Sequence, residues 1–266
     1  SPVKARYFRI ACDGSRRFSQ IRFSNVIRTD DWQKRANYSF NRSGTKEVAG
    51  TDSIPINSLL DVSQYVNQDG LLTWDAPKGN WTILRFGFTP LGTMNRSAPD
   101  TGVGLECDKY SSEAMEFHFN KMMENLLPAL KSLSTNGKVG LLIDSYEVGM
   151  QNWTAGFEAE FKNRNNYDLL KHLPAFTGRI VESADITDRF LWDIRRTQGD
   201  LMADNYYGKF TALCHRHNML SYCQPYDRGP MEEMQIGSRI DINVGEFWNN
   251  LSSIFQNNWT MRRTVK

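Results

Sequence analysis

The spacing of hydrophobic and polar residues divides the chain into two regions. From Val3 to about Phe88, hydrophobic residues alternate with polar ones or form short runs, which turn-forming pairs such as Asp13-Gly14 separate. Alternation with a period of two between such turns is typical of antiparallel strands. We therefore predict a β-rich, sandwich-like domain over residues 1–90, with strands at residues 5–10, 21–23, 71–74 and 81–86.

The second region, residues 91–266, alternates long helical patterns with brief hydrophobic strands. A capping motif at Ser111-Ser112-Glu113 begins a helix that continues to Leu127, and a second long helix is expected from Thr187 to Asn218. Strands separated by helices favour parallel βα units. The predicted fold is therefore α/β plus β, in which part of a (β/α)8 barrel follows the β-sandwich-like region. Its strands are expected at residues 139–144, 220–223 and 240–244.

Polar and aromatic residues follow each predicted strand of the second region. Glu147 comes shortly after the first strand and Glu246 shortly after the third. In a parallel barrel the catalytic groups lie at the carboxyl ends of the strands. Glycoside cleavage requires one carboxyl group to protonate the leaving oxygen and a second to attack or to activate water. Glu147 and Glu246 are thus candidate catalytic residues, although either carboxylate could instead cap the helix that follows it.

Six further residues are candidates for substrate binding, and each has a structural alternative. Aromatic rings stack on sugar faces but also fill hydrophobic cores. Asp144 could bind a sugar, bind a metal ion or pair with an arginine. Asp108 and Lys109 could bind sugar hydroxyls or form a structural ion pair with each other. The six candidates are Asp144, Trp153, Tyr226, Trp248, Asp108 and Lys109.

Composition narrows the classes of partner. The 32 basic and 30 acidic residues leave a formal charge of +2 with no run of like charge, so we expect neither a nucleic-acid nor a membrane partner. Four cysteines without a C-x-x-C pair predict free thiols rather than a zinc site. His118, His215 and His217 fall in helical stretches, where a solvated or core position is favoured over metal binding.

No signal peptide or membrane-length hydrophobic run occurs in the sequence. The pattern of both ends predicts a fragment of a longer chain, with any export signal outside it. We expect the whole protein to be secreted or periplasmic, with a carbohydrate substrate and the remainder of the parent polypeptide as its partners.

Six longer motifs resemble the catalytic region of glycoside hydrolase family 106, the α-L-rhamnosidases. Their order and combination are more specific than any single motif, and together they cover roughly residues 70–260. They lie at residues 85–89, 104–109, 144–154, 189–197, 205–208 and 245–248.

This resemblance implies a (β/α)8 catalytic domain with β-domains, calcium dependence, and release of terminal α-L-rhamnose from plant or complex glycans with inversion. It also implies that Glu147 is the acid and Glu246 the base. One position departs from the family pattern, because Gln224 stands where an acidic residue is expected. An amide there can still bind a hydroxyl, but the local negative charge is lower by one.

Three other interpretations remain open at this stage. A retaining glycosidase of another barrel family would use one glutamate as a nucleophile, with the two carboxyl groups only about 5–5.5 Å apart. A non-catalytic carbohydrate-binding module would need the aromatic residues but not both glutamates. The β-rich region could also be a spacer that supports the barrel.

Overall fold

The computed structural model describes residues 28–39, 52–95, 98–133, 137, 139–227 and 229–246. In the following order of elements, η marks a 3₁₀ helix except in η5, which is π-helical. The order is α1 (Trp32–Arg35), η1 (Ile56–Ser58), η2 (Ser63–Tyr65), η3 (Asp100–Gly102), α2 (Ser112–Leu133), β1 (Gly140–Ile143), α3 (Phe157–Asn165), η4 (Leu170–Thr177), α4 (Ala184–Leu201), η5 (Met202–Gly208), α5 (Lys209–Arg216), β2 (Leu220–Cys223), α6 (Glu233–Gly237) and β3 (Ile242–Asn243).

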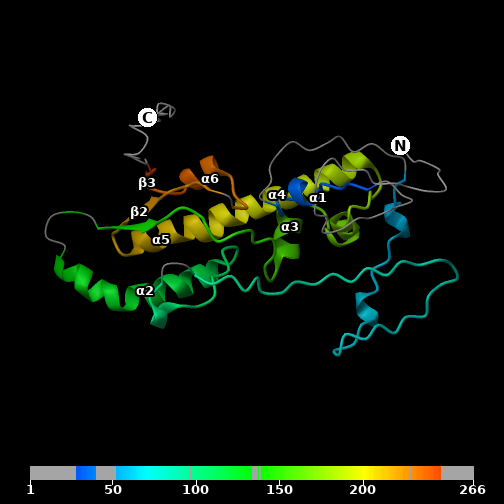
Figure 1. Cartoon of the computed structure of the whole chain (residues 1–266), viewed down its shortest axis with the longest axis horizontal. Coiled ribbons are helices and arrows are strands. Elements are labelled where there is room, and N and C mark those ends of the chain that lie inside the picture. Colours follow the sequence, from blue (N-terminus) through cyan, green and yellow to red (C-terminus); the bar gives the residue numbers. More distant parts are fainter. Residues whose placement is uncertain are drawn as a thin grey trace, which may run out of the picture.

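A parallel sheet with the strand order β1-β2-β3 lies at one end of the molecule (Figure 1). In its register Gly140 lies opposite Leu220, and Tyr222 lies opposite Ile242. A Cβ atom on Gly140 would lie 2.0 Å from the ring of Tyr222, so only glycine fits this close approach of β1 to β2. The parallel pairing of the three strands confirms the prediction of βα units.

The two long predicted helices are both present. Ser111 caps α2, since its Oγ accepts a hydrogen bond from the Ala114 N–H at 3.1 Å and donates one to Glu113 at 2.9 Å. Residues 184–216 form one continuous rod of α4, η5 and α5 (Figure 1). Phe119 of α2 meets Phe210 of α5 edge to face, with ring centroids 6.3 Å apart, which joins α2 to this rod.

The core of the described residues lies along the rod. Ser183 caps the start of α4 through a hydrogen bond from the Ile186 N–H at 3.1 Å. One face of α4 is then buried at spacings of three and four residues, including Phe190, Leu191 and Ile194. This amphipathic face packs on α3, η4 and α1, while β2 packs on α5 at the other end of the rod.

Residues 52–95 form an extended arm beside the helical body (cyan in Figure 1). Isolated bridges join Ile54 to Val181 and Val66 to Leu72, but the predicted strands at residues 71–74 and 81–86 form no ladder in the described structure. A ladder needs a neighbouring segment that continues along the whole strand. Residues 71–73 have only a short neighbour, where the Thr73 N–H donates to Tyr65 and Leu71 accepts from the Asn67 N–H, both at 3.0 Å, and residues 81–86 form no backbone hydrogen bond with another described segment.

The predicted strands at residues 5–10 and 21–23 lie outside the described residues. The β-sandwich, the domain boundary near residue 90 and the membership of the three strands in a (β/α)8 barrel stay predictions.

Candidate active site

The carboxyl ends of the three strands lie side by side and are held there by backbone hydrogen bonds. The pairing of the strands extends beyond their ends, because the Gln224 N–H donates to Ile143 at 3.1 Å and the Val244 N–H donates to Cys223 at 2.9 Å. In addition, the Tyr146 N–H donates to the carbonyl of Tyr226 at 3.2 Å. The loops after β1, β2 and β3 thus form one edge, as a parallel sheet requires.

Glu147 lies on the loop after β1 with an exposed side chain. Its Oε1 accepts a hydrogen bond from the Ser145 hydroxyl at 2.9 Å. Together with Asp144 and Tyr146 it lines a cavity of about 300 Å³, which is bounded on the other side by α2. Glu147 is therefore at the mouth of a cavity large enough for a sugar ring.

Glu246, on the loop after β3, is connected to the centre of this edge by Tyr226. The Tyr226 hydroxyl accepts a hydrogen bond from the Glu246 N–H at 3.0 Å and donates one to Gln224 Oε1 at 2.9 Å. Burial, followed by the negative charges of Glu246 and Asp144, raises the pKa of Tyr226. Tyr226 thus lies near both acids and stays a neutral hydrogen-bonding group.

Tyr226 was predicted to bind substrate, and the structure shows that its hydroxyl already has two protein partners. Gln224, where the family pattern has an acid, is one of them. The amide oxygen accepts the Tyr226 proton just as a carboxylate would, but without its charge.

Lys109 is buried behind Glu147, with only 4% of its surface exposed. Its ammonium lies 2.7 Å from Glu106 and faces the rings of Tyr146 and Tyr206, whose centroids are 5.8 and 5.6 Å away. Burial raises the pKa of both tyrosines, so their hydroxyls stay protonated. Lys109 lines the cavity, but its charge is already balanced by Glu106.

The carboxylate of Asp108 points into the surrounding loops. It accepts hydrogen bonds from the Tyr110 N–H at 2.9 Å and from the side chains of Gln151 and Thr154. These bonds join residues 108–110 to the loop that carries Trp153. The alternative of an ion pair between Asp108 and Lys109 is not what the structure shows, since Lys109 pairs with Glu106.

The two predicted tryptophan platforms have different outcomes. Trp153 is half-buried and packs on Phe157, with ring centroids 4.6 Å apart, and on Phe88 at 6.4 Å. Trp153 is thus held by hydrophobic packing, as expected if the ring belongs to the core rather than to a sugar-binding platform. Trp248 lies outside the described residues.

Sequence reasoning missed several residues that line the cavity. His118 is exposed on α2, which is one of its two expected positions, and it also lines the same cavity as Glu147. Glu106 and Tyr206 were not singled out, although both lie inside motifs that carry the family resemblance. Their place in those motifs was the one signal that pointed to them.

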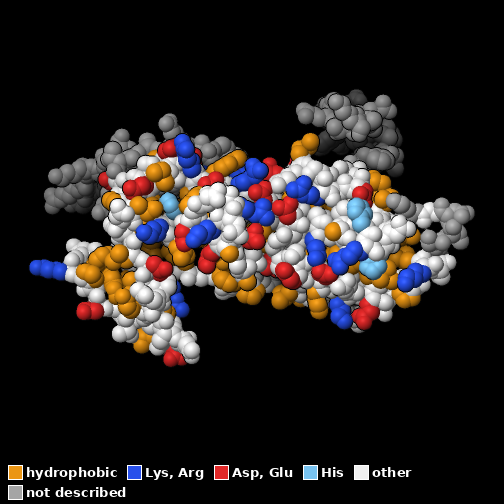
Figure 2. Space-filling view, turned by 180° about the vertical axis from the view of Figure 1, so that it is seen from behind, with side chains coloured by type: hydrophobic (Ala, Val, Ile, Leu, Met, Phe, Trp, Pro, Cys, Tyr) orange, Lys and Arg blue, Asp and Glu red, His pale blue; other side chains and the backbone are white. Residues whose placement is uncertain are grey.

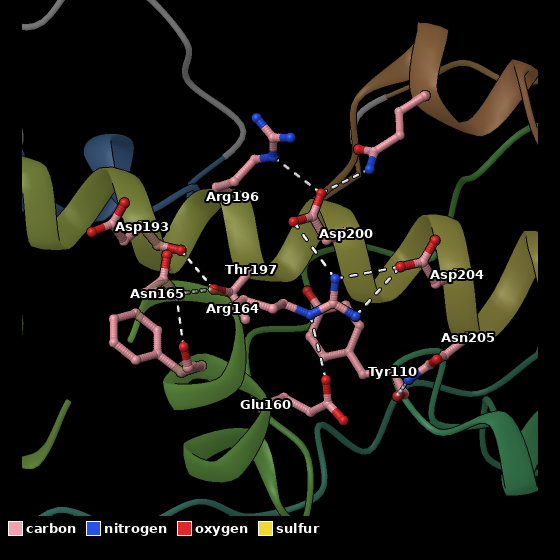
Figure 3. A network of polar contacts seen from close by, with 12 residues as sticks. Tyr110, Glu160, Arg164, Asn165, Asp193, Arg196, Thr197, Asp200, Asp204 and Asn205 are labelled. Atoms are coloured by element: carbon pink, nitrogen blue, oxygen red, sulfur yellow. Dashed lines mark hydrogen bonds and ion pairs between the residues drawn. The ribbon is translucent and has the colours of Figure 1, made fainter. Parts of the chain in front are cut away.

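A network of polar contacts joins α3, the rod and the segment of Tyr110 (Figure 3). Arg164 of α3 lies 3.3 Å from Asp204 of η5, and Asp204 also pairs with Arg239 at 2.9 Å. Nearby, Asn205 of η5 donates to the carbonyl of Tyr110 at 2.6 Å. Arg239 shortly precedes β3, so the wide π-helical turn of η5 connects the helical body to the strand that ends near Glu246.

A calcium site is not evident among the described residues. No group of three or more His, Cys, Asp or Glu side chains converges in that part of the chain. Calcium also takes backbone and amide carbonyl oxygens and water as ligands, so calcium dependence stays a prediction. The structure likewise contains no helix, within the described ranges, that is long and hydrophobic enough to cross a membrane.

Two known proteins are similar to this chain over most of its length. A protein named "Putative beta-glucuronidase" from Formosa agariphila is 45% identical over 204 residues, which are 77% of this chain and 18% of that protein. The structure of a rhamnosidase from Novosphingobium sp. PP1Y matches with a TM-score of 0.64 and 26% identity, over 82% of this chain and 22% of that one. The chain thus spans about a fifth of the length of these relatives.

The family comparison covers almost the whole sequence. The family model for glycoside hydrolase family 106, described as alpha-L-rhamnosidase, matches residues 9–263. This match and the rhamnosidase structure agree with the resemblance of the six motifs. The chain belongs to glycoside hydrolase family 106, the α-L-rhamnosidase family.

Proposed function

We propose that this chain carries both catalytic carboxylates of an inverting glycoside hydrolase that releases terminal α-L-rhamnose, with Glu147 as the acid and Glu246 as the base. The observation that supports this most directly is the order of the strands. Glu147 follows β1 and Glu246 follows β3, while β2 and Tyr226 lie between them.

The intervening strand favours inversion over retention. Adjacent strands lie about 4.8 Å apart, so two strands separated by a third are roughly 9–10 Å apart. Inverting enzymes hold their carboxyl groups about 6.5–9.5 Å apart to leave room for water, whereas retaining enzymes hold them about 5–5.5 Å apart. Side chains that lean toward each other from β1 and β3 fit the wider separation.

The reaction assigns one proton transfer to each glutamate. The protonated carboxyl of Glu147 donates its proton to the glycosidic oxygen as the bond from that oxygen to the anomeric carbon breaks. The carboxylate of Glu246 removes a proton from a water molecule, whose oxygen attacks the anomeric carbon from the opposite face. The products are free rhamnose of inverted configuration and the aglycone with its new hydroxyl group.

A β-glucuronide is the second candidate substrate, because the relative from Formosa agariphila bears the name of a glucuronidase. A glucuronide carries a carboxylate, which a site would match with an unpaired cation. The lysine that lines the cavity beside Glu147 is Lys109, and its ammonium is already 2.7 Å from Glu106. This pairing favours the uncharged rhamnosyl group.

Calcium dependence is a separate part of the proposal and rests on the family resemblance. The described part holds no group of three or more His, Cys, Asp or Glu side chains, so a site there would rely largely on carbonyl oxygens and water. Activity that is lost with a chelator and restored by calcium would support this part.

The test compares Glu147→Gln, Glu246→Gln and the exposed control Glu158→Gln in the full-length protein that contains this chain. The substrates are aryl α-L-rhamnosides with good and poor leaving groups and an aryl β-D-glucuronide. We expect each catalytic variant to lose about 10²–10⁴-fold in kcat. The loss in Glu147→Gln should be smaller for the good leaving group, which needs no acid, while the loss in Glu246→Gln should not depend on the leaving group.

Proton NMR of the first product distinguishes the mechanisms. Initial release of β-L-rhamnose supports inversion, whereas initial release of α-L-rhamnose would establish retention. Cleavage of the glucuronide alone would assign the second candidate function. Full activity in both Glu147→Gln and Glu246→Gln would show that neither glutamate is catalytic, and would favour a carbohydrate-binding role for this chain.

A further inference from the structure

A second cavity, of about 430 Å³, lies between the arm of residues 52–95 and the helical body. Residues 54–60 and 80–84 form one wall, and Pro174 and Arg179 form the other. The walls are joined by backbone hydrogen bonds, from the Ile54 N–H to Ile180 and from the Glu182 N–H to Ile54, both 2.8 Å long. The cavity has no lining residue in common with the one beside Glu147.

The arm contributes a fixed aromatic ring and two side-chain amides to this cavity. The Trp81 indole N–H donates to the carbonyl of Pro77 at 2.8 Å, and the ring meets Trp74 edge to face at 5.3 Å. These contacts orient Trp81 while 41% of its surface stays exposed. Asn57 and Asn80 line the cavity and are both exposed. Figure 2 shows hydrophobic side chains gathered on this arm.

The body contributes two positive charges with no acidic partner. Arg179 lines the cavity and donates to the Thr177 hydroxyl at 2.6 Å. Arg28 lies against Gly178, the residue before Arg179, and its buried Nη1 has no hydrogen-bond partner. No salt bridge joins either arginine to a carboxylate within the part of the chain that the structure describes. The nearby Glu182 carboxylate instead accepts the Ile56 N–H at 2.6 Å.

Burial and the charge of Arg179 both lower the pKa of Arg28, so these like charges lie close enough to repel each other. Two adjacent guanidinium groups without a counter-charge are stabilised by an anion, which guanidinium groups bind through paired hydrogen bonds.

An exposed tryptophan face beside amide groups suits a pyranose ring and its hydroxyls. The cavity volume is also within the range of small-ligand sites, about 300–1,000 Å³.

We propose that this cavity is a second carbohydrate site, which binds a sugar bearing a carboxylate or a sulfate group, with Trp81 against the ring and Arg179 on the anion. Asn57 and Asn80 bind its hydroxyls, and Arg28 adds to the positive potential. The site holds an acidic unit of a glycan apart from the residue that is cleaved. The proposal does not depend on the reaction at Glu147 and Glu246.

Ligand-observed NMR titration of the full-length protein tests this proposal with three probes: methyl β-D-glucuronide, glucose 6-sulfate and the neutral methyl β-D-glucoside. We expect at least one acidic probe to bind, and the neutral probe to bind about tenfold more weakly or not at all. The relative affinities of the two acidic probes tell whether the anion is a carboxylate or a sulfate. Arg179→Gln should weaken the acidic probe by about tenfold and leave the neutral probe unchanged.

Three further variants keep the result interpretable. Arg189→Gln removes an exposed arginine that pairs with Asp185 and should bind like the unchanged protein. Asn80→Ala, at an exposed position on the arm, should weaken both acidic and neutral probes even if Arg179→Gln folds poorly. Glu147→Gln should bind the acidic probe normally, because the two cavities are separate. Equal affinity for acidic and neutral probes, no binding of any probe, or unchanged binding in both Arg179→Gln and Asn80→Ala would overturn the proposal.

Discussion

Replacing Tyr226 by phenylalanine separates two roles that this residue could have. The change removes one hydroxyl group, which accepts the Glu246 N–H at 3.0 Å and donates to Gln224 at 2.9 Å. The ring and the backbone contact with Tyr146 stay in place. If Tyr226 positions Glu246, the variant should lose kcat. If it binds the sugar in both ground and transition states, the variant should raise KM.

The magnitude follows from the two lost hydrogen bonds. Each is worth about 0.5–1.5 kcal/mol net, and because the site is partly open to water we expect a loss of about 1–2 kcal/mol in the free energy of unfolding. The catalytic effect is expected to be larger. A misplacement of a catalytic group by about 1 Å can cost up to about 10²-fold in rate, so we expect kcat to fall by about 10–10²-fold with KM nearly constant.

The assay is steady-state hydrolysis of an aryl α-L-rhamnoside, with urea denaturation to monitor the fold. Tyr222→Phe is the matched control, because it removes a tyrosine hydroxyl from the same region, one without a hydrogen bond to another described residue. An increase in KM with unchanged kcat in Tyr226→Phe would refute positioning and favour direct substrate binding. Unchanged values of both would show that the link to Glu246 has no catalytic role.

Three further predictions concern stability. Asp241→Asn should cost about 1 kcal/mol at neutral pH, because the backbone N–H of Ser221 donates to the carboxylate at 2.8 Å. The same bond is the largest cause that lowers the pKa of Asp241 in the folded chain, so this stabilisation is lost progressively as the pH falls from about 4 through that lowered pKa, and urea denaturation should show the two proteins converging as the pH is lowered. Gly140→Ala should cost about 1–3 kcal/mol, because its new methyl group would overlap the Tyr222 ring, and the added change Tyr222→Ala should recover part of that loss in a double-mutant cycle. Leu191→Ala should cost about 2–5 kcal/mol in the same assay because the side chain is fully buried, and a loss below about 1 kcal/mol would show that α4 is not packed as described.

The order and type of the main elements in the second region could be predicted from the sequence alone. The capping residue Ser111, the hydrophobic face of residues 187–201 and the short run at residues 220–223 are local patterns, and the structure places a helix or a strand on each. Alternation of these elements also predicted parallel pairing, because parallel strands need a crossover between them. The positions of Glu147 and Glu246 at one edge follow from the same rule.

Only the tertiary structure decided which side chains meet at that edge. Lys109 pairs with Glu106 rather than with its neighbour Asp108, and Tyr226 connects Gln224 to Glu246. A sequence with 30 acidic and 32 basic residues allows many such pairs, and local spacing does not choose among them. The predicted strands of the arm depend on neighbours from elsewhere in the chain for the same reason. The periodicity that predicts a helix lies within one short segment of sequence. Ion pairs and strand ladders instead join segments that only folding brings together.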